Sequence, residues 1–147
     1  MSGKTALVAG ASGLVGSNLL KLLISDNSFA KIKVVARKPL EIKNEKISEV
    51  VLNFDELNHH AQKLSADVVF CCLGTTIRTA GSQENFRKVD YTYCTELAKA
   101  TKAQGAKQFI LVSSLGAGSS SANFYLRTKG ETENFISQLE FPSYCIM

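Results

Sequence analysis

The chain has 147 residues, 45% of them apolar and 20% charged, which predicts one globular domain with a buried core. Its net charge is only +4 and its lysines are scattered along the chain, so we expect no nucleic-acid partner. No apolar run approaches the roughly 20 residues of a membrane span, and the N-terminus lacks the layout of a signal peptide. These features favour a cytoplasmic protein that does not enter a membrane.

The first segment of the chain is the most informative. An apolar, strand-like run at 4–9 ends in three glycines spaced three apart, Gly10, Gly13 and Gly16, and an amphipathic helical segment follows at 14–23. Only glycine lets a backbone turn this sharply and approach a ligand closely. The N–H groups and the positive dipole end of the helix can then hold a phosphate. The spacing differs from the usual G-x-G-x-x-G fingerprint, so a plain strand-to-helix turn is the alternative interpretation.

Strand-like and helix-like segments alternate along the whole chain. Strands are predicted at 4–9, 31–36, 47–52, 67–73, 107–113 and 143–147, and helices at 14–23, 55–64, 82–104 and 123–139. This alternation predicts an α/β fold with a doubly wound parallel sheet of the Rossmann type, and residues 1–147 as its single domain. No helix follows the last predicted strand. We therefore expect that a partner or a further segment covers that end of the sheet.

The end of the second predicted strand bears on the choice of cofactor. In a dinucleotide-binding fold an acidic residue at this point accepts a hydrogen bond from the ribose 2′-hydroxyl of NAD. Here Arg37 and Lys38 stand there instead, and the first acid after the strand is Glu41. A guanidinium suits a phosphate, and a lysine adds a point charge. The sequence therefore predicts NADP rather than NAD, with a solvated basic turn as the alternative.

Two further segments are placed by the expected topology. Asn53 and Phe54 follow the third predicted strand and are expected to lie along the edge of the adenine ring. Leu73, Gly74 and Thr75 follow the fourth strand and are expected to run along the cofactor toward the nicotinamide. Both predictions rest on the rule that doubly wound sheets bind ligands at the carboxyl ends of their strands.

The four cysteines give no sign of a disulfide or metal site. Cys71, Cys72, Cys94 and Cys145 form no C-x-x-C pair, so no metal-ligand spacing is present. We expect them to be small buried hydrophobic residues in a reducing compartment.

The predicted helix at 123–139 carries the candidate chemistry. Tyr125 and Lys129 are four residues apart, so they share one helix face. A tyrosine beside a cation can donate a proton to a carbonyl oxygen or accept it in reverse. Ser113 and Ser114 end the fifth predicted strand, where a hydroxyl could hold the substrate oxygen. Capping of the strand end is the alternative role of either serine.

These motifs together resemble the short-chain dehydrogenase/reductase superfamily, in its extended or atypical branch. The narrower resemblance is to the Tat-interacting oxidoreductase family and its bacterial NAD(P)H-binding relatives. It extends over essentially the whole chain and is carried by residues 10–16, 71–76, 89–91, 113–117 and 125–131.

The resemblance implies a Rossmann fold, NADPH as cofactor and a role for each matching residue. The pyrophosphate would be cradled by Gly10, Ser12, Gly13, Leu14, Val15 and Gly16, and Arg37 would meet the 2′-phosphate. Tyr125 would be the acid/base, Lys129 would tune it and hold the nicotinamide ribose, and Ser114 would orient the carbonyl. Members of the family usually continue past the last strand with segments that build the substrate pocket.

Two functions follow as hypotheses. The first is an NADP-dependent oxidoreductase that transfers a hydride between nicotinamide and a small carbonyl or alcohol substrate. The second is a regulatory module that binds NADP(H) and a protein partner without chemistry. A homodimer is also compatible with the resemblance, because in many relatives the long helix corresponding to 82–104 packs against a second subunit.

Overall fold

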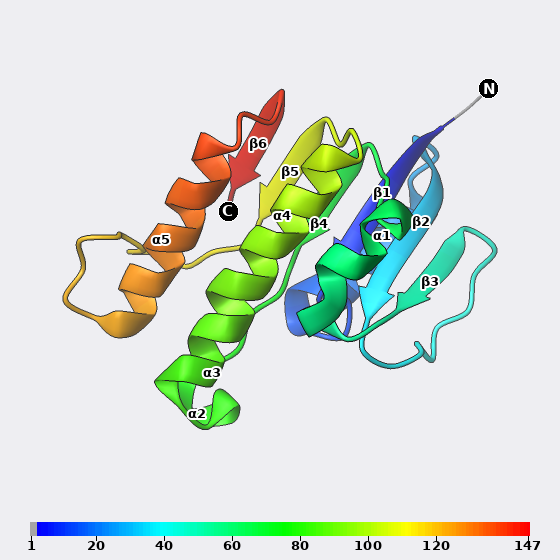
Figure 1. Cartoon of the computed structure of the whole chain (residues 1–147). Coiled ribbons are helices and arrows are strands. Elements are labelled where there is room, and N and C mark those ends of the chain that lie inside the picture. The colour runs from blue at the N-terminus through cyan, green and yellow to red at the C-terminus, as the bar shows by residue number, and fades with distance from the viewer. Residues whose placement is uncertain (1–2) are drawn as a thin grey trace.

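The computed structural model describes residues 3–147 and contains one six-stranded sheet in the order β3-β2-β1-β4-β5-β6 (Figure 1). Every pair of neighbouring strands is parallel. The strand order reverses between β1 and β4, which is the switch point of a doubly wound sheet. The predicted Rossmann-like α/β fold is confirmed. The strands are β1 (Lys4–Ala9), β2 (Phe29–Ala36), β3 (Ile47–Val51), β4 (Val68–Cys71), β5 (Gln108–Leu111) and β6 (Ser143–Ile146).

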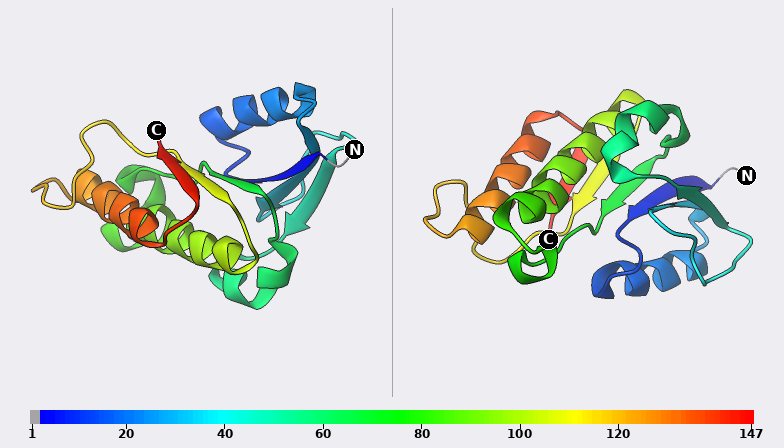
Figure 2. Two further views of the ribbon diagram at one scale, coloured as in Figure 1. Left: turned by 90° about the horizontal axis from the view of Figure 1, so that it is seen from above. Right: turned by 60° about the horizontal axis from the view of Figure 1, so that its bottom comes forward.

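Helices cover both faces of the sheet (Figure 2). Helix α1 (Leu14–Ser25) lies on one face, against β1 and β2. The 3₁₀ segment η1 (Phe54–Lys63), helix α4 (Cys94–Ala103) and helix α5 (Phe124–Gln138) lie on the other. Two short helices, α2 (Ile77–Ala80) and α3 (Gln83–Arg87), and a π-helical segment, η2 (Lys88–Tyr93), lead into α4. None of the helices within residues 3–147 is long and apolar enough to cross a membrane.

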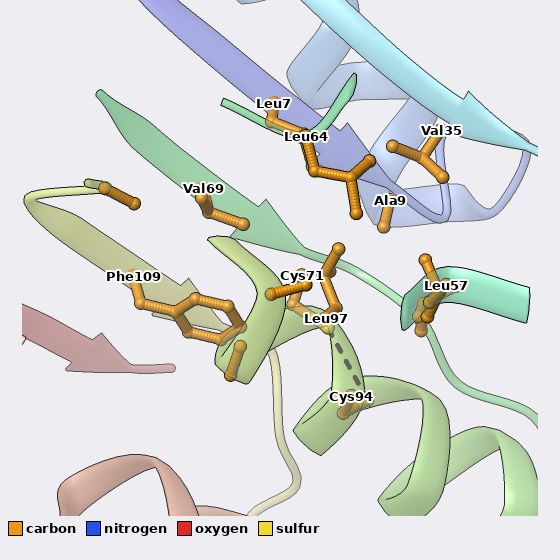
Figure 3. Close-up of a cluster of buried hydrophobic side chains, with 14 of the residues drawn as sticks. Leu7, Ala9, Val35, Leu57, Leu64, Val69, Cys71, Cys94, Leu97 and Phe109 are labelled. Carbon is orange, nitrogen blue, oxygen red and sulfur yellow. Dashed lines mark hydrogen bonds between the residues drawn. The ribbon is translucent and has the colours of Figure 1, made fainter. Parts of the chain in front are cut away.

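The strands alternate their side chains between two apolar layers. Leu7, Val69 and Phe109 point toward the η1–α4–α5 side, where Leu97 of α4 is fully buried among them (Figure 3). The other layer lies under α1 and includes Ala6, Val8, Ile32 and Val34 of the strands with Leu20 and Leu23 of the helix. Burial on both faces explains why the central strands read as continuous apolar runs.

The long predicted helix at 82–104 is interrupted. It consists of α3, the π-helical η2 and α4, and α2 precedes it as a turn that the sequence did not indicate. A π-helical turn changes which residues face inward, and here it buries the carboxylate of Asp90. Pi-helical turns inside α-helices occur frequently at functional sites.

The cysteines only partly match the expectation of burial. Cys71 and Cys94 are buried, with their sulfur atoms 3.5 Å apart (Figure 3). The hydrogen bond to Cys71, together with burial, raises the pKa of the Cys94 thiol well above its usual range. Cys72 is half-buried, whereas Cys145 is exposed, contrary to the prediction. Cys145 lies on the edge strand β6 beside Ile110, on the face opposite the layer that contains α5.

Candidate functional site

The candidate site lies at the carboxyl edge of the sheet. Because all the strands run in parallel, the segments that follow β1, β4 and β5 emerge at this same edge (Figure 1). They are the glycine turn at 10–16, the loop at 72–76 and the segment at 112–123. The N-terminal end of α5 lies at the same edge of the molecule. The fold thus gathers segments that are far apart in the sequence.

At two of the three positions in the turn, only glycine fits without a steric clash. Gly10 has a positive φ of 85°, and a Cβ there would lie 2.4 Å from the carbonyl oxygen of Cys72. A Cβ on Gly16 would lie 2.0 Å from the carbonyl oxygen of Gly10. Both are well inside van der Waals contact, so any larger residue would separate α1 from β1, or β1 from the β4 loop.

Gly13 differs from Gly10 and Gly16 in this respect. A Cβ there would meet only the Gly10 carbonyl oxygen, at an ordinary 3.6 Å. Gly13 is the N-cap of α1 and provides no side-chain hydrogen bond. Leu14 and Val15, in the first turn of that helix, are 82% and 50% exposed although both are apolar. Ser12 is exposed as well.

The glycine turn therefore offers an anion site that its own side chains do not fill. The first N–H groups of a helix have no intrahelical acceptor. At α1 no capping side chain accepts from them, and the surface around them is open. This donor set fits a pyrophosphate.

The basic pair after β2 is open to solvent. Arg37 and Lys38 are both exposed, and neither takes part in an ion pair with any residue in the 3–147 range. They lie directly after the carboxyl end of β2, beside β1 in the sheet. They are therefore free to accept an anionic group.

The two residues expected at the adenine have different environments. Asn53 is exposed and caps η1, with its side-chain oxygen accepting a hydrogen bond from the Asp55 N–H at 3.0 Å. Phe54 is only 7% exposed, and its ring packs against Tyr93 at a centroid distance of 5.5 Å. Phe54 is thus primarily a core residue, whereas the Asn53 side chain is accessible.

The loop after β4 runs beside α5. Leu73 is buried, Gly74 is exposed and Thr75 is half-buried. A Cβ on Gly74 would lie 3.4 Å from Asp90 Oδ1 and 3.5 Å from Lys129 Nζ. The absence of a side chain at Gly74 leaves the Lys129 ammonium close to the backbone that is expected to face the nicotinamide.

Helix α5 carries Tyr125 and Lys129 on one face, as predicted. Its N-cap, Asn123, accepts a hydrogen bond from the Leu126 N–H at 3.1 Å, and this fixes where the helix begins. The Lys129 ammonium lies 5.6 Å from the centroid of the Tyr125 ring. This ring also packs against Phe86, at a centroid distance of 5.2 Å.

Gly130 allows the loop before α5 to pack against that helix. A Cβ on Gly130 would lie 2.3 Å from the carbonyl carbon of Gly118. The Gly118 N–H also donates to the Leu126 carbonyl at 3.1 Å. The small-residue loop is therefore held against α5 close to Tyr125.

Lys129 forms a buried ion pair that the site prediction did not include. Its Nζ lies 2.5 Å from Asp90 Oδ1, and the two side chains are 9% and 0% exposed. Burial opposes the charged form of Lys129, but the hydrogen bond and charge of Asp90 outweigh it and raise the pKa of the lysine above its ordinary value. Burial raises the pKa of Asp90, and its bonds to Lys129 and to the Thr75 N–H offset this only partly.

The two serines after β5 are not equivalent. The Ser113 hydroxyl donates to Glu133 Oε1 at 2.7 Å, so it is committed to a partner on α5. The Ser114 hydroxyl has only a long contact of 3.5 Å with the Leu115 carbonyl. Ser114 is half-buried and is therefore the serine whose hydroxyl is available to a ligand.

Sequence reasoning missed Asp90, Glu133 and Gly130. A signal existed for Asp90, because a carboxylate stands among apolar positions in the middle of a predicted helix, and a buried charge requires a partner. No comparable signal marked Glu133, whose contact depends on how α5 packs beside β5.

Comparison with known proteins places the chain in a family. Residues 10–140 match the profile of a family described as NAD(P)H-binding. Protein HTATIP2 from Rattus norvegicus is 39% identical over 145 residues, which are 96% of this chain and 60% of the relative. The mitochondrial protein FMP52 from Debaryomyces hansenii is 41% identical over 147 residues, with 97% and 64% covered. The chain thus spans somewhat less than two thirds of these relatives, and its resemblance to the Tat-interacting family is confirmed.

Solved structures share the fold at low sequence identity. MoeE5 in complex with UDP-glucose and NAD has a TM-score of 0.77 at 18% identity, covering 96% of this chain and 52% of that one. Uronate dehydrogenase from Agrobacterium tumefaciens has a TM-score of 0.76 at 18% identity, covering 99% and 59%. These structures show the Rossmann-like fold, and the family profile and the curated relatives show that the chain belongs to the NAD(P)H-binding family.

Proposed function

We propose that this chain is the cofactor domain of an NADP-dependent oxidoreductase that interconverts a carbonyl and an alcohol. The observation that carries the proposal is that the α5 helix, with Tyr125 and Lys129 near its start, and the segment after β5 that carries Ser114 lie at the edge of the sheet that holds the glycine turn. Ser114 has an uncommitted hydroxyl, and Lys129 is fixed as an ammonium near the Tyr125 ring. A site for binding alone has no need of this combination.

The chemistry assigned to each side chain follows from its type. NADPH, when bound, supplies the hydride that forms the new C–H bond at the carbonyl carbon. Tyr125 donates its hydroxyl proton to the carbonyl oxygen, which becomes the alcohol, and takes it back in the reverse direction. Ser114 donates a hydrogen bond to the same oxygen and stabilises its developing charge. Lys129 places positive charge beside Tyr125 and the cofactor ribose.

The preference for NADP rests on Arg37 and Lys38. Both are exposed and unpaired in the described part of the chain, next to the carboxyl end of β2. No carboxylate occurs in β2 or between it and Glu41 to accept from a ribose 2′-hydroxyl. A guanidinium can bind the 2′-phosphate that distinguishes NADP from NAD. We assign Asn53 and the edge of Phe54 to the adenine, and Leu73, Gly74 and Thr75 to the path toward the nicotinamide.

The first experiment is a calorimetric titration of the purified chain with NADPH and with NADH. Tight binding of NADPH and much weaker binding of NADH would support the assignments of the glycine turn and of Arg37. Equal affinities would overturn the choice of NADP. No binding of either nucleotide would contradict the proposal for this chain.

A regulatory NADP(H)-binding module is the second candidate. The chain spans 60% and 64% of two curated relatives, and the edge strand β6 exposes Tyr144 at 45%, a surface that a protein partner or a second copy could cover. NADPH binding without turnover of any carbonyl in a substrate screen would favour this candidate. The compartment we propose is a reducing one such as the cytoplasm; fungal relatives are named as mitochondrial proteins.

A further inference from the structure

Asp90 is the one acidic residue buried in the described part of the chain, and it lies in the π-helical turn η2. Its two carboxylate oxygens have different partners. Oδ1 lies 2.5 Å from Lys129 Nζ and has no other polar partner among residues 3–147. Oδ2 accepts the Thr75 N–H at 3.0 Å. One side chain on η2 is thus bonded both to α5 and to the loop after β4.

The surroundings of this carboxylate are closely packed. Gly74 passes so near that a Cβ there would lie 3.4 Å from Asp90 Oδ1. The Thr132 hydroxyl of α5 donates to the Asp90 carbonyl oxygen at 2.7 Å, which ties the two helical segments a second time. The loop, η2 and α5 therefore have little freedom to move apart at this point.

We propose that Asp90 is a positioning residue, whose carboxylate fixes the Lys129 ammonium and the Gly74–Thr75 loop relative to each other. This inference rests on the proposed function, because both parts are assigned there to the cofactor and the acid/base pair. An ammonium has three donors. With one directed at Asp90, the other two are left for Tyr125 and for the ribose hydroxyls.

The same contact maintains the charge of Lys129. A buried lysine without a counter-charge tends to lose its proton, whereas Asp90 raises the pKa of Lys129 above its ordinary value against the effect of burial. The other titratable groups that face Lys129 are the Tyr125 hydroxyl and the Cys94 thiol. The hydrogen bond to Cys71 and burial raise the pKa of the Cys94 thiol well above its usual range, and the acidic residue that pairs with Lys129 is Asp90.

The direct test is a pH titration of the Lys129 side chain by NMR, in the ligand-free chain with isotope-labelled lysine. Lys129→Met identifies the signal by its loss. In the unmodified chain the midpoint should lie above that of the solvent-exposed lysines. In Asp90→Asn, which keeps the shape and an acceptor for the Thr75 N–H, the midpoint should fall by at least about one pH unit, a tenfold change.

Glu131→Gln is the matched control. Glu131 pairs with Arg87 on the same pair of helical segments, but these two side chains are partly exposed to solvent, at 33% and 40%, so the Lys129 midpoint should not move. An unchanged midpoint in Asp90→Asn would overturn the inference. If that variant fails to fold, the unmodified chain still decides, because a midpoint at or below that of exposed lysines also overturns it.

Nucleotide binding tests the positioning role. NADPH titrations of Asp90→Asn should show at least about a tenfold loss of affinity that grows as the pH rises and Lys129 loses its proton. The double variant with Lys129→Met should bind no more weakly than Lys129→Met alone. The result that contradicts the proposal is a loss of NADPH affinity in Asp90→Asn that is equal at every pH and that adds in full to the loss caused by Lys129→Met. That result would indicate a merely structural role. If the unmodified chain does not bind NADPH, the proposed function fails, whereas the lysine titration still decides the role of Asp90.

Discussion

At the scale of single residues, the site depends on a few side chains whose neighbours leave them available. Ser113 is bonded to Glu133, whereas Ser114 is not engaged in this way. Arg37 has no ion-pair partner in the described chain, whereas Lys129 forms an ion pair with Asp90. A polar group without a partner is free to bind a ligand, and a paired one is fixed in place.

Tyr125→Phe should lower turnover by about 10²–10⁴-fold, the usual contribution of general acid–base catalysis, because the ring remains and only the hydroxyl is lost. The measurement is steady-state reduction of a carbonyl substrate found by screening. NADPH affinity should stay unchanged in the same variant. Tyr144→Phe, on the exposed edge strand, is the control, and an unimpaired Tyr125→Phe would remove that residue from the mechanism.

Arg37→Ser should weaken NADPH binding by about tenfold while changing NADH binding little. Hydrogen bonds to charged groups contribute about 1.5–3 kcal/mol, and the exposure of Arg37 argues for the lower end because solvent screens the pair. Calorimetric titration of Arg37→Ser with NADPH and with NADH compares the two affinities in the same variant. An equal loss for NADPH and NADH would show that Arg37 does not recognise the 2′-phosphate.

At the scale of elements, the glycine turn and the start of α5 set the geometry of the site. Gly16 brings α1 against the turn that follows β1, and Asn123 defines the first turn of α5. The positions of strands and of amphipathic helices followed from apolar periodicity, and the predicted bounds of β1 are confirmed. The π-helical turn η2 was not predicted from the sequence, and the residue that it buries, Asp90, pairs with Lys129 of a helix that comes later in the chain.

Gly16→Ala should destabilise the fold by about 3 kcal/mol, the upper end of the usual cost of overpacking, because its Cβ would lie 2.0 Å from a backbone oxygen. Gly13→Ala is the matched comparison, since its Cβ would make an ordinary 3.6 Å contact, and its stability should change by less than about 1 kcal/mol. Urea denaturation measures both. If Gly13 faces the pyrophosphate, its alanine variant should nevertheless bind NADPH more weakly.

Asn123→Ala should lower the free energy of unfolding by about 1 kcal/mol, the usual cost of losing an N-cap. The bond lost is that from the Leu126 N–H to the Asn123 side chain. Because Tyr125 lies in the same turn, turnover should also fall. Asn123→Ser keeps a capping oxygen and should restore both properties; failure of serine to do so would assign Asn123 a different role.

At the scale of the whole molecule, the proposed cofactor site joins the β1, β4 and α5 parts of the fold. A ligand that binds across these segments stabilises the native chain as a unit. At a concentration about 100 times its dissociation constant, NADPH should raise the free energy of unfolding by about 2.7 kcal/mol. For a chain of this size that corresponds to a rise in Tm of roughly 5–10 °C.

The measurement is a thermal melt with increasing NADPH and, separately, NADH at equal concentrations. The rise should be larger for NADPH, and Gly13→Ala should show a smaller rise than the unmodified chain. A Tm that is insensitive to both nucleotides, at concentrations up to the millimolar range, would contradict a cofactor site in this chain.

The sequence by itself determined the class of fold, the glycine turn and the face shared by Tyr125 and Lys129, because each depends on neighbours within a few residues of chain. Strand burial, helix periodicity and the requirement for glycine at a sharp turn are local properties. Only the tertiary structure decided that Asp90 pairs with Lys129, that Ser113 is committed and Ser114 is not, and that Phe54 lies in the core. These contacts join residues from different elements, and their formation depends on how the helices pack on the sheet.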